Sequence, residues 1–303
     1  MTSFVPLVLG LTLAPLLMGV INRTKAFFAG RQGQPLLQLY YDLWKLLRKG
    51  AVYSQTTTWI FRAGPIVGLA CAVAALALMP LLRTPAPVSF AGDFILAVYL
   101  LGLGRFFTVL AALDTGSSFE GMGASREAHF AALAEPALLL ALVTLVLMVG
   151  EKSLSGLMGN LDALHWLNSG PALVLILAAL FMVLLAENAR IPVDDPNTHL
   201  ELTMIHEVMV LDHGGPDFAL IQYGAALKLW FFASLVVSVA LPLPEMPLAL
   251  LAVAGVAGVM LVGVGVGILE STMARLRLLT VPYFLLGATV LAAVALLLTA
   301  FRA

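Results

Sequence analysis

The residues of this sequence whose types and spacing could do chemistry gather between positions 187 and 207. This stretch of 21 residues holds five carboxylates, one arginine and two histidines. They are Glu187, Arg190, Asp194, Asp195, His199, Glu201, His206 and Glu207. Burial raises the pKa of a carboxylate and a nearby cation lowers it, so such a cluster can bind and release protons. Apolar segments flank the stretch on both sides, and charge beside or inside a membrane usually marks a functional site.

Three more ionisable residues fall inside apolar segments: Arg105, Glu135 and Lys228. Pro136 follows Glu135 directly, and a carboxylate there is either neutral, paired or part of a proton path. A purely structural pair stays open as an alternative. Lys228 lies about ten residues into its segment, too deep for its side chain to reach the surface easily.

The overall composition is that of an integral membrane protein. The chain is 61% hydrophobic and 11% charged, whereas soluble proteins carry roughly 25% charged residues. A net charge of −1 without blocks of like charge argues against a nucleic-acid partner. The single cysteine, Cys71, cannot form an internal disulfide or a thiolate metal site, so we interpret it as a small buried apolar residue.

Eight apolar segments are long enough to cross a bilayer. We place them at 3–21, 64–82, 94–113, 128–149, 171–186, 218–241, 247–269 and 281–301. The segments are continuous and rich in leucine and alanine, so they do not alternate as strands do. The sequence therefore predicts an all-α, polytopic membrane protein with a single transmembrane domain over 1–303. Glycines in the seventh span predict close helix packing.

The distribution of lysine and arginine predicts the orientation. The loops at 22–63, 114–127, 187–217 and 270–280 carry eleven of these residues. The other side carries three, at Arg83, Lys152 and Arg302. This bias places the four basic loops in the cytoplasm and both termini outside. The first segment has no basic region before it and no small-residue cleavage site, so we expect it to be a retained span.

The first of these loops contains a predicted amphipathic helix over 36–47, with a basic end. Such a helix normally lies in the plane of the membrane interface. It is either a surface anchor or the wall of a site shared with a soluble partner, and the pattern alone does not separate the two.

A second helix is predicted over 196–213, because Asp195 is a good N-cap and Pro196 a good first residue. It would place His199 and His206 on one face, two turns and roughly 10 Å apart, too far to chelate one metal unaided. The second histidine of a zinc-protease motif is also missing after His206. We expect no metal site here.

Several motifs resemble the family of respiratory complex I membrane subunit 1. Glu187, Arg190, Pro192 and Asp194 have the spacing of its signature Glu-x-x-Arg-x-Pro-x-Asp, and Glu201-Leu202 matches the continuation. The first-loop pattern is present at Leu37-Gln38, Asp42 and Lys45-Leu46, and an Arg–Glu pair at Arg126 and Glu135. The likeness covers essentially the whole chain.

Two segments are more similar to the formate hydrogenlyase and energy-converting membrane-bound hydrogenase branch. The first combines 113–117, which includes Asp114, with 123–127, which ends at Glu127. The second joins Glu270 to 273–278, which includes Arg275 and Arg277. The signature departs from complex I at Asn197 and His199, where further glutamates are expected. These departures weigh against a complex I-like quinone site.

The resemblance implies a membrane subunit that links electron transfer in a soluble iron–sulfur arm to proton or sodium translocation. Its implied partners are antiporter-like membrane subunits and hydrogenase-like large and small subunits, which would carry iron–sulfur clusters and a nickel–iron site. This chain itself would hold no redox centre and sit in the bacterial or archaeal cytoplasmic membrane. The implied coupling residues are Glu135, Glu187, Arg190, Asp194, Glu201, Lys228, Arg105, Asp114, Arg126 and Glu127. The implied partner-interface residues are Gln38, Asp42, Lys45, Asp195, His199, His206, Glu207, Glu270, Arg275 and Arg277.

Two other functions compete with this interpretation. A quinone-reducing dehydrogenase subunit would need a lipid-accessible cavity beneath the loops at 22–63, 114–127 and 187–217. A free-standing secondary transporter would be expected to show internal repeats and paired broken helices. We see no such repeat in the sequence, and the polar residues gather on one side.

Overall fold

The computed structural model describes residues 2–194 and 204–301. Within these two ranges the regular structure is helical and contains no β-strand. Eight helices there are long and apolar enough to cross a membrane, which confirms the predicted class and number of spans. They are α1 (Val5–Phe28, preceded by the 3-10 turn Thr2–Phe4), α3 (Trp59–Leu78), α4 (Asp93–Asp114), α5 (Ser118–Val149), α7 (Ala163–Glu187), α8 (Gly215–Ala240), α9 (Leu248–Thr272) and α10 (Val281–Ala300).

Shorter helices lie in the connections between the spans. They are α2 (Gln38–Leu47), α6 (Leu154–Asn160) and the 3-10 turns η2 (Glu207–Val210) and η3 (Leu278–Thr280). Helix α2 confirms the predicted amphipathic helix over 36–47. It begins two residues later than expected and ends at the same residue.

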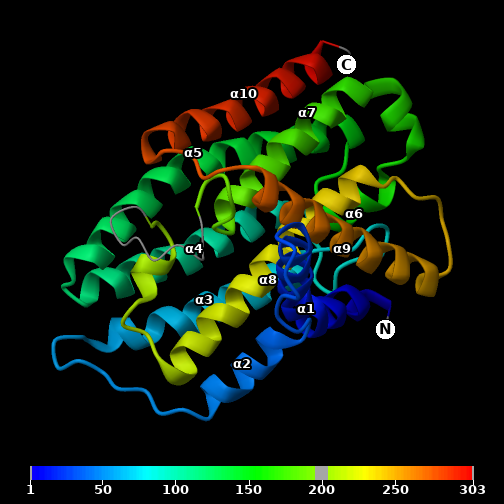
Figure 1. Ribbon diagram of the computed structural model, residues 1–303. Helices are drawn as coiled ribbons and strands as arrows, with labels where there is room; N and C mark the ends of the chain where they lie inside the picture. The colour runs from blue at the N-terminus through cyan, green and yellow to red at the C-terminus, as the bar shows by residue number, and fades with distance from the viewer. Residues whose placement is uncertain (1, 195–203, 302–303) are drawn as a thin grey trace.

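Helix α8 is the central span of the bundle. It packs against α1, α3, α7 and α9, and the figure shows it crossing the middle of the molecule (Figure 1). Its Trp230 and Phe232 are almost completely buried. Since a helix enclosed by protein can carry a charge that lipid would not tolerate, α8 is a suitable support for Lys228.

The glycines of α9 allow α1 to approach closely, as predicted. A Cβ atom at Gly263 would lie 2.5 Å from a side-chain carbon of Leu17, and one at Gly267 would lie 2.7 Å from Thr24. A side chain larger than hydrogen at either position would therefore push the two helices apart. On the other side of the molecule, α10 lies along α5 and α7 (Figure 1).

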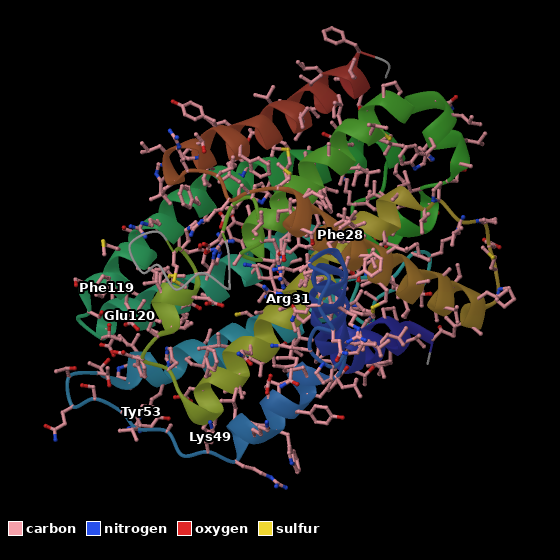
Figure 2. The ribbon with its side chains drawn as sticks, viewed as in Figure 1. Phe28, Arg31, Lys49, Tyr53, Phe119 and Glu120 are labelled. Carbon is pink, nitrogen blue, oxygen red and sulfur yellow. The ribbon has the colours of Figure 1, made fainter. Side chains whose placement is uncertain are left out.

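Several loops meet at one end of the bundle, which we call the loop face (residues 29–58, 115–117, 188–194, 204–214 and 273–280). Asp114 at the end of α4 accepts hydrogen bonds from the backbone and hydroxyl of Thr58. The amide of Leu276 donates to the carbonyl of Pro192 at 2.9 Å. Lys49 and Tyr53 lie in the segment that joins α2 to α3, at this end of the molecule (Figure 2).

Two predictions about this end were wrong. Residues 118–127, expected as a loop, form the first turns of α5, which at 32 residues is about 48 Å long and outlasts a bilayer core of about 30 Å. Gly123 in this part is covered by Val208 and Met209, so tertiary packing stabilises the helix there. This extension places Glu127 on a helix rather than on a loop.

The helix expected over 196–213 does not form in its described part. Residues 204–213 contain only the 3-10 turn Glu207–Val210, because the amides of Ile205 and His206 donate to the side chain of Asp194 instead of entering a helix. Asp195, Pro196 and the rest of that prediction up to 203 lie outside the described residues. The fifth span also begins earlier than predicted, at Ala163, because Asp162 forms a capping box with His165.

Candidate functional site

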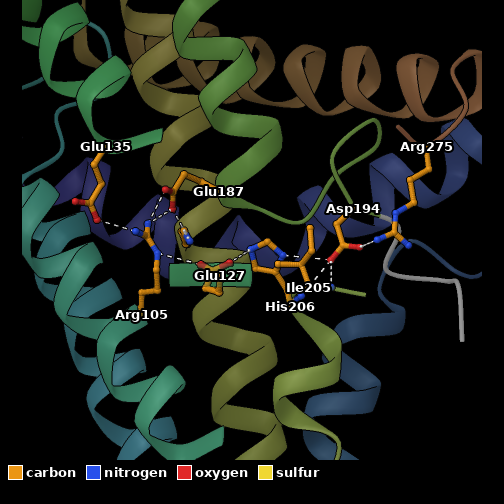
Figure 3. A network of polar contacts seen from close by, with 9 residues as sticks. Arg105, Glu127, Glu135, Glu187, Asp194, Ile205, His206 and Arg275 are labelled. Atoms are coloured by element: carbon orange, nitrogen blue, oxygen red, sulfur yellow. Dashed lines mark hydrogen bonds and ion pairs between the residues drawn. The ribbon is translucent and has the colours of Figure 1, made fainter. Parts of the chain in front are cut away.

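Arg105 is the centre of a cluster of carboxylates from two neighbouring helices. It projects from α4, and its guanidinium contacts Glu135 at 2.7 Å, Glu127 at 3.0 Å and Glu187 at 2.5 Å (Figure 3). Glu127 and Glu135 come from α5 and Glu187 is the last residue of α7. One arginine thus joins two carboxylates of α5 to a third, at the end of α7, that is more than fifty positions further along the chain.

Lys228 provides the second cation of the cluster. Its ammonium nitrogen lies 2.8 Å from Oε2 of Glu187. Glu187 therefore has a cation on each side, Arg105 from α4 and Lys228 from α8. Such pairing lowers the cost of holding a carboxylate away from water.

His206 links this cluster to the loop face. Its Nε2 lies 3.1 Å from Oε2 of Glu127, and its Nδ1 lies 3.3 Å from Oδ2 of Asp194 (Figure 3). Asp194 in turn pairs with Arg275 at 2.9 Å. The contacts form one continuous line from Glu135, within a span, to Arg275 on the loop face.

Asp194 and His206 lie outside the spans, and their pKa values move in opposite directions. Burial alone raises the pKa of Asp194, but the hydrogen bonds and charge of His206, together with Arg275, lower it below the usual range. Burial alone lowers the pKa of His206, but the charges of Glu127 and Asp194 outweigh it and raise the pKa above its usual value. Each shift favours the charged form of its group.

A second buried cluster holds the start of the 188–194 segment against α1 and α9. The carboxylate of Glu270, whose side chain is 0% exposed, contacts Lys25 at 2.8 Å and Arg190 at 3.4 Å. Arg190 is buried as well. Glu270 was predicted at a partner interface, and the structure places it inside the protein.

Two cavities adjoin the clusters. The larger, about 380 Å³, reaches from Gln38 and Asp42 on α2 to Glu187 and Lys228. The smaller, about 150 Å³, is lined by a set that includes Arg105, Glu127, His206 and Lys228. Both cavities are large enough for several water molecules, since one water molecule needs only about 10–15 Å³ of cavity volume measured in this way.

Helix α2 has two faces of different character, and its role as a surface anchor or as the wall of a partner site stays a prediction. Gln38 donates a hydrogen bond to Asp42 at 2.8 Å, and both line the larger cavity. Tyr41 and Trp44 are exposed, and the guanidinium of Arg48 stacks on the Trp44 ring. One face is therefore the wall of a cavity, and the other has the aromatic and basic residues typical of a membrane interface.

The structure also shows the surroundings of several other predicted residues among those it describes. Asp114 caps the start of α3, and Arg126 donates to the carbonyl of Met204. Lys45 and Arg277 are exposed, and Glu207 lines the larger cavity. The predicted residues Asp195, His199 and Glu201 lie outside the described residues.

Sequence reasoning missed Lys25, which neutralises Glu270 together with Arg190. Lys25 lies in the last turn of α1 and looked like one of many basic residues that set orientation. In the part of the chain that the structure describes, no group of three histidine, cysteine or acidic side chains is placed to hold a metal ion. Cys71 is buried, as expected for a small apolar residue.

Comparison with known proteins agrees with the resemblance seen in the motifs. The chain is 35% identical over 277 residues to hydrogenase-4 component C of Escherichia coli (strain K12), which covers 89% of this chain and 86% of that protein. It is 33% identical over 288 residues to formate hydrogenlyase subunit 4 of the same organism, with 92% of each covered. An NADH-quinone oxidoreductase subunit of Paraburkholderia xenovorans (strain LB400) is 28% identical over 194 residues, 61% of this chain and 54% of that protein.

A solved structure shares the fold. A chain of the membrane-bound sulfane sulfur reductase, an archaeal respiratory membrane complex, superposes with a TM-score of 0.82 over 98% of both chains at 22% identity. The model of the NADH dehydrogenase family matches residues 2–301. The chain is therefore a member of the NADH dehydrogenase family of membrane proteins, with relatives among the membrane subunits of hydrogenases.

Proposed function

We propose that this chain is the anchoring and energy-coupling membrane subunit of a hydrogenase-type or complex I-like oxidoreductase. It holds a soluble iron–sulfur arm on the loop face and links electron transfer there to proton or sodium translocation. The observation that carries this proposal is the continuous line of ion pairs from Arg275 and Asp194, through His206 and Glu127, to Arg105 and Glu135.

The line supports coupling because its charges depend on one another. Arg105 is shared by three carboxylates, so a proton that binds to one of them weakens that contact and strengthens the hold on the other two. A change of charge or conformation at the loop face would act first on Asp194. Through the ion pairs it can therefore alter the proton affinity of the carboxylates around Arg105. The line of ion pairs thus offers a physical route by which electron transfer in the soluble arm can change ion binding within the membrane.

The partners follow from the same proposal. The soluble arm would comprise hydrogenase-like large and small subunits with iron–sulfur clusters and a nickel–iron site, and antiporter-like subunits would lie beside this chain in the membrane. The chain itself would carry no redox centre. Its loop face would lie in the cytoplasm, with both termini on the outer side of a bacterial or archaeal cytoplasmic membrane.

The test uses the complex purified through a tag on this chain, with its subunits identified. The complex is reconstituted into vesicles and driven with a reduced viologen dye, while a trapped pH indicator and a sodium-sensitive dye follow ion movement. Redox turnover should move protons or sodium ions across the vesicle membrane. Turnover with no ion movement in sealed vesicles would refute the coupling function.

A matched pair of variants ties the movement to this chain. Glu187→Gln keeps the shape of the side chain but removes its charge between Arg105 and Lys228, so we expect electron transfer without ion movement. Glu245→Gln changes an exposed carboxylate at the opposite end and should behave as wild type. The isolated chain alone in vesicles should be inactive, whereas a free-standing transporter would move ions without partners.

The larger cavity favours a second candidate function, quinone binding. At about 380 Å³ it falls within the size range of ligand pockets, and it lies beneath the 22–63 and 187–217 loops. Apolar Leu39 and Phe218 line it beside the polar Gln38 and Asp42. A photoreactive quinone analogue should label these residues if a quinone enters, and the absence of labelling would leave the hydrogenase-type function alone.

A further inference from the structure

We infer that His206 is the proton relay that joins the loop face to the carboxylates around Arg105. The inference rests on the coupling function proposed above and names the residue through which coupling passes. Its basis is the placement of the imidazole ring, with one nitrogen on Glu127 and the other on Asp194.

The geometry favours a doubly protonated ring. Nε2 lies 3.1 Å from a Glu127 oxygen and Nδ1 lies 3.3 Å from an Asp194 oxygen. A carboxylate only accepts hydrogen bonds, and a neutral imidazole has a single N–H. While both acids are ionised, only the imidazolium donates to both of them, and loss of its proton to water would break one of the two contacts.

The net charge of the groups along the line depends on whether His206 is protonated. Among the described residues of the line, the carboxylates are Glu127, Glu135, Glu187 and Asp194. The permanent cations are Arg105, Lys228 and Arg275. Within this set of eight groups, a protonated His206 is the fourth cation and balances the fourth carboxylate, whereas a neutral ring leaves one negative charge in excess.

The groups that face His206 come from several elements and act in opposite directions. Glu127 of α5 and Asp194 of the 188–194 segment favour the imidazolium, and Lys228 of α8 opposes it. The pKa of His206 is raised as a result, although burial alone lowers it. A histidine held this way keeps its proton at rest and releases it when one of the two carboxylates is neutralised or moves.

Water access is available on both sides of the ring. His206 lines the larger cavity, which extends toward α2, and also the smaller cavity beside Arg105. Its side chain is 22% exposed, whereas that of Glu127 is only 6% exposed. The ring is thus the most accessible titratable group in direct contact with Glu127.

The relay step is balanced for protons. The Nε2 proton passes to Oε2 of Glu127, which leaves a neutral ring with its remaining proton on Nδ1, toward Asp194. Uptake of one proton from water in the larger cavity restores the imidazolium. Neutral Glu127 no longer pairs with Arg105, so the guanidinium shifts its pairing to Glu187 and Glu135. The change of charge at His206 thereby alters the ion pairs within the spans.

Two substitutions separate a relay from a structural ion pair. His206→Gln cannot titrate, and His206→Arg supplies a permanent charge that can still pair with both carboxylates. We expect either assembled complex to keep electron transfer and to lose about tenfold or more of its ion movement. The residual movement should no longer respond to pH across the range in which the wild type titrates.

The control is His129→Gln, which changes an exposed histidine two residues beyond Glu127 on the same helix. This variant should translocate as the wild type does. Wild-type ion movement in assembled His206→Arg would show that the charge alone matters and would overturn the relay. Wild-type movement in assembled His206→Gln would overturn it as well.

A measurement on the unsubstituted complex decides the case if both variants fail to assemble. Redox-induced infrared difference spectra of complex labelled with 15N-histidine should contain imidazole bands that shift with the label. A coupled wild-type complex without such bands would overturn the relay and leave the coupling function intact. A wild-type complex that moves no ions would refute the coupling function and the relay with it.

Discussion

The guanidinium of Arg105 lies 2.7 Å from the carboxylate of Glu135 and so connects the interior of the protein to its outer surface. The Arg105 side chain is 9% exposed, whereas that of Glu135 is 40% exposed. Glu135 also lines a groove with Tyr99 and Phe106, both exposed on α4. The Glu135 carboxylate is thus paired with Arg105 toward the interior of the protein and is also exposed at the protein surface.

Glu135→Gln tests whether this carboxylate carries protons or only holds Arg105. Arg105 keeps Glu127 and Glu187 in the variant, so its charge stays compensated and assembly should survive. Ion movement in vesicles should fall if Glu135 titrates, and Glu135→Asp should retain part of it. Subunit content and ion movement are measured together.

Glu245→Gln is the control, since that carboxylate is exposed at the other end of the bundle. Normal assembly with fully normal ion movement in Glu135→Gln would remove Glu135 from the path. Poor assembly would instead assign it a structural role.

The sequence predicted the spans well because each depends on a local property. Eight continuous apolar runs predict eight helices whatever their neighbours, and the structure contains them. The partners of the charges could not be predicted in this way. Arg105 and Glu187 are 82 positions apart, and their contact depends on how α4 and α7 each pack against α5.

The part of the 196–213 prediction that the structure describes, residues 204–213, failed for the same reason. The N-cap and glycine signals there are typical of a helix, yet they are weak compared with tertiary contacts. Asp194 takes the amides of Ile205 and His206 as its own hydrogen-bond donors, and this turns the described part of the segment toward Glu127. His206, which was predicted at a partner interface, therefore lies within the line of ion pairs.

Glu270→Gln should destabilise the protein strongly. The substitution leaves the buried Arg190 and the partly buried Lys25 without their carboxylate, and breaking such a buried pair costs about 3–5 kcal/mol. We expect a lower unfolding temperature of the purified protein. Adding Lys25→Met should restore part of the loss, because it removes one of the two uncompensated charges. An unchanged unfolding temperature in Glu270→Gln would contradict this role.

The orientation of the loop face can be measured with single cysteines. Cys71→Ala removes the native thiol, and cysteines are then placed one at a time in 29–58 and 204–214. Because eleven lysines and arginines lie in the four basic loops, we expect an impermeant thiol reagent to label these sites only from the cytoplasmic side. A cysteine after Arg83, on the opposite side, is the control. Labelling of the loop face in intact cells would reverse the assignment.

Asp194→Asn should change how stability depends on pH. The pKa of Asp194 in the folded protein is below its usual value, so its stabilisation is present above about pH 3.9 and is lost as the pH falls through the folded pKa. The pKa of His206 is raised, so its stabilisation is present below about pH 6.5 and is lost as the pH rises through the folded pKa. Both groups are charged between these limits, and their pair contributes most there.

The variant should therefore differ most from wild type in mildly acidic solution, by about 1–3 kcal/mol. The difference should vanish at low pH, where Asp194 is itself neutral. It should shrink but persist at high pH, because the contact of Asp194 with Arg275 does not need His206 to be charged. Thermal unfolding of the purified protein between about pH 2 and 9 measures this profile, with Glu245→Gln as the control. A constant difference at every pH would mean that Asp194 acts through its hydrogen bonds to Ile205 and His206 rather than through its charge.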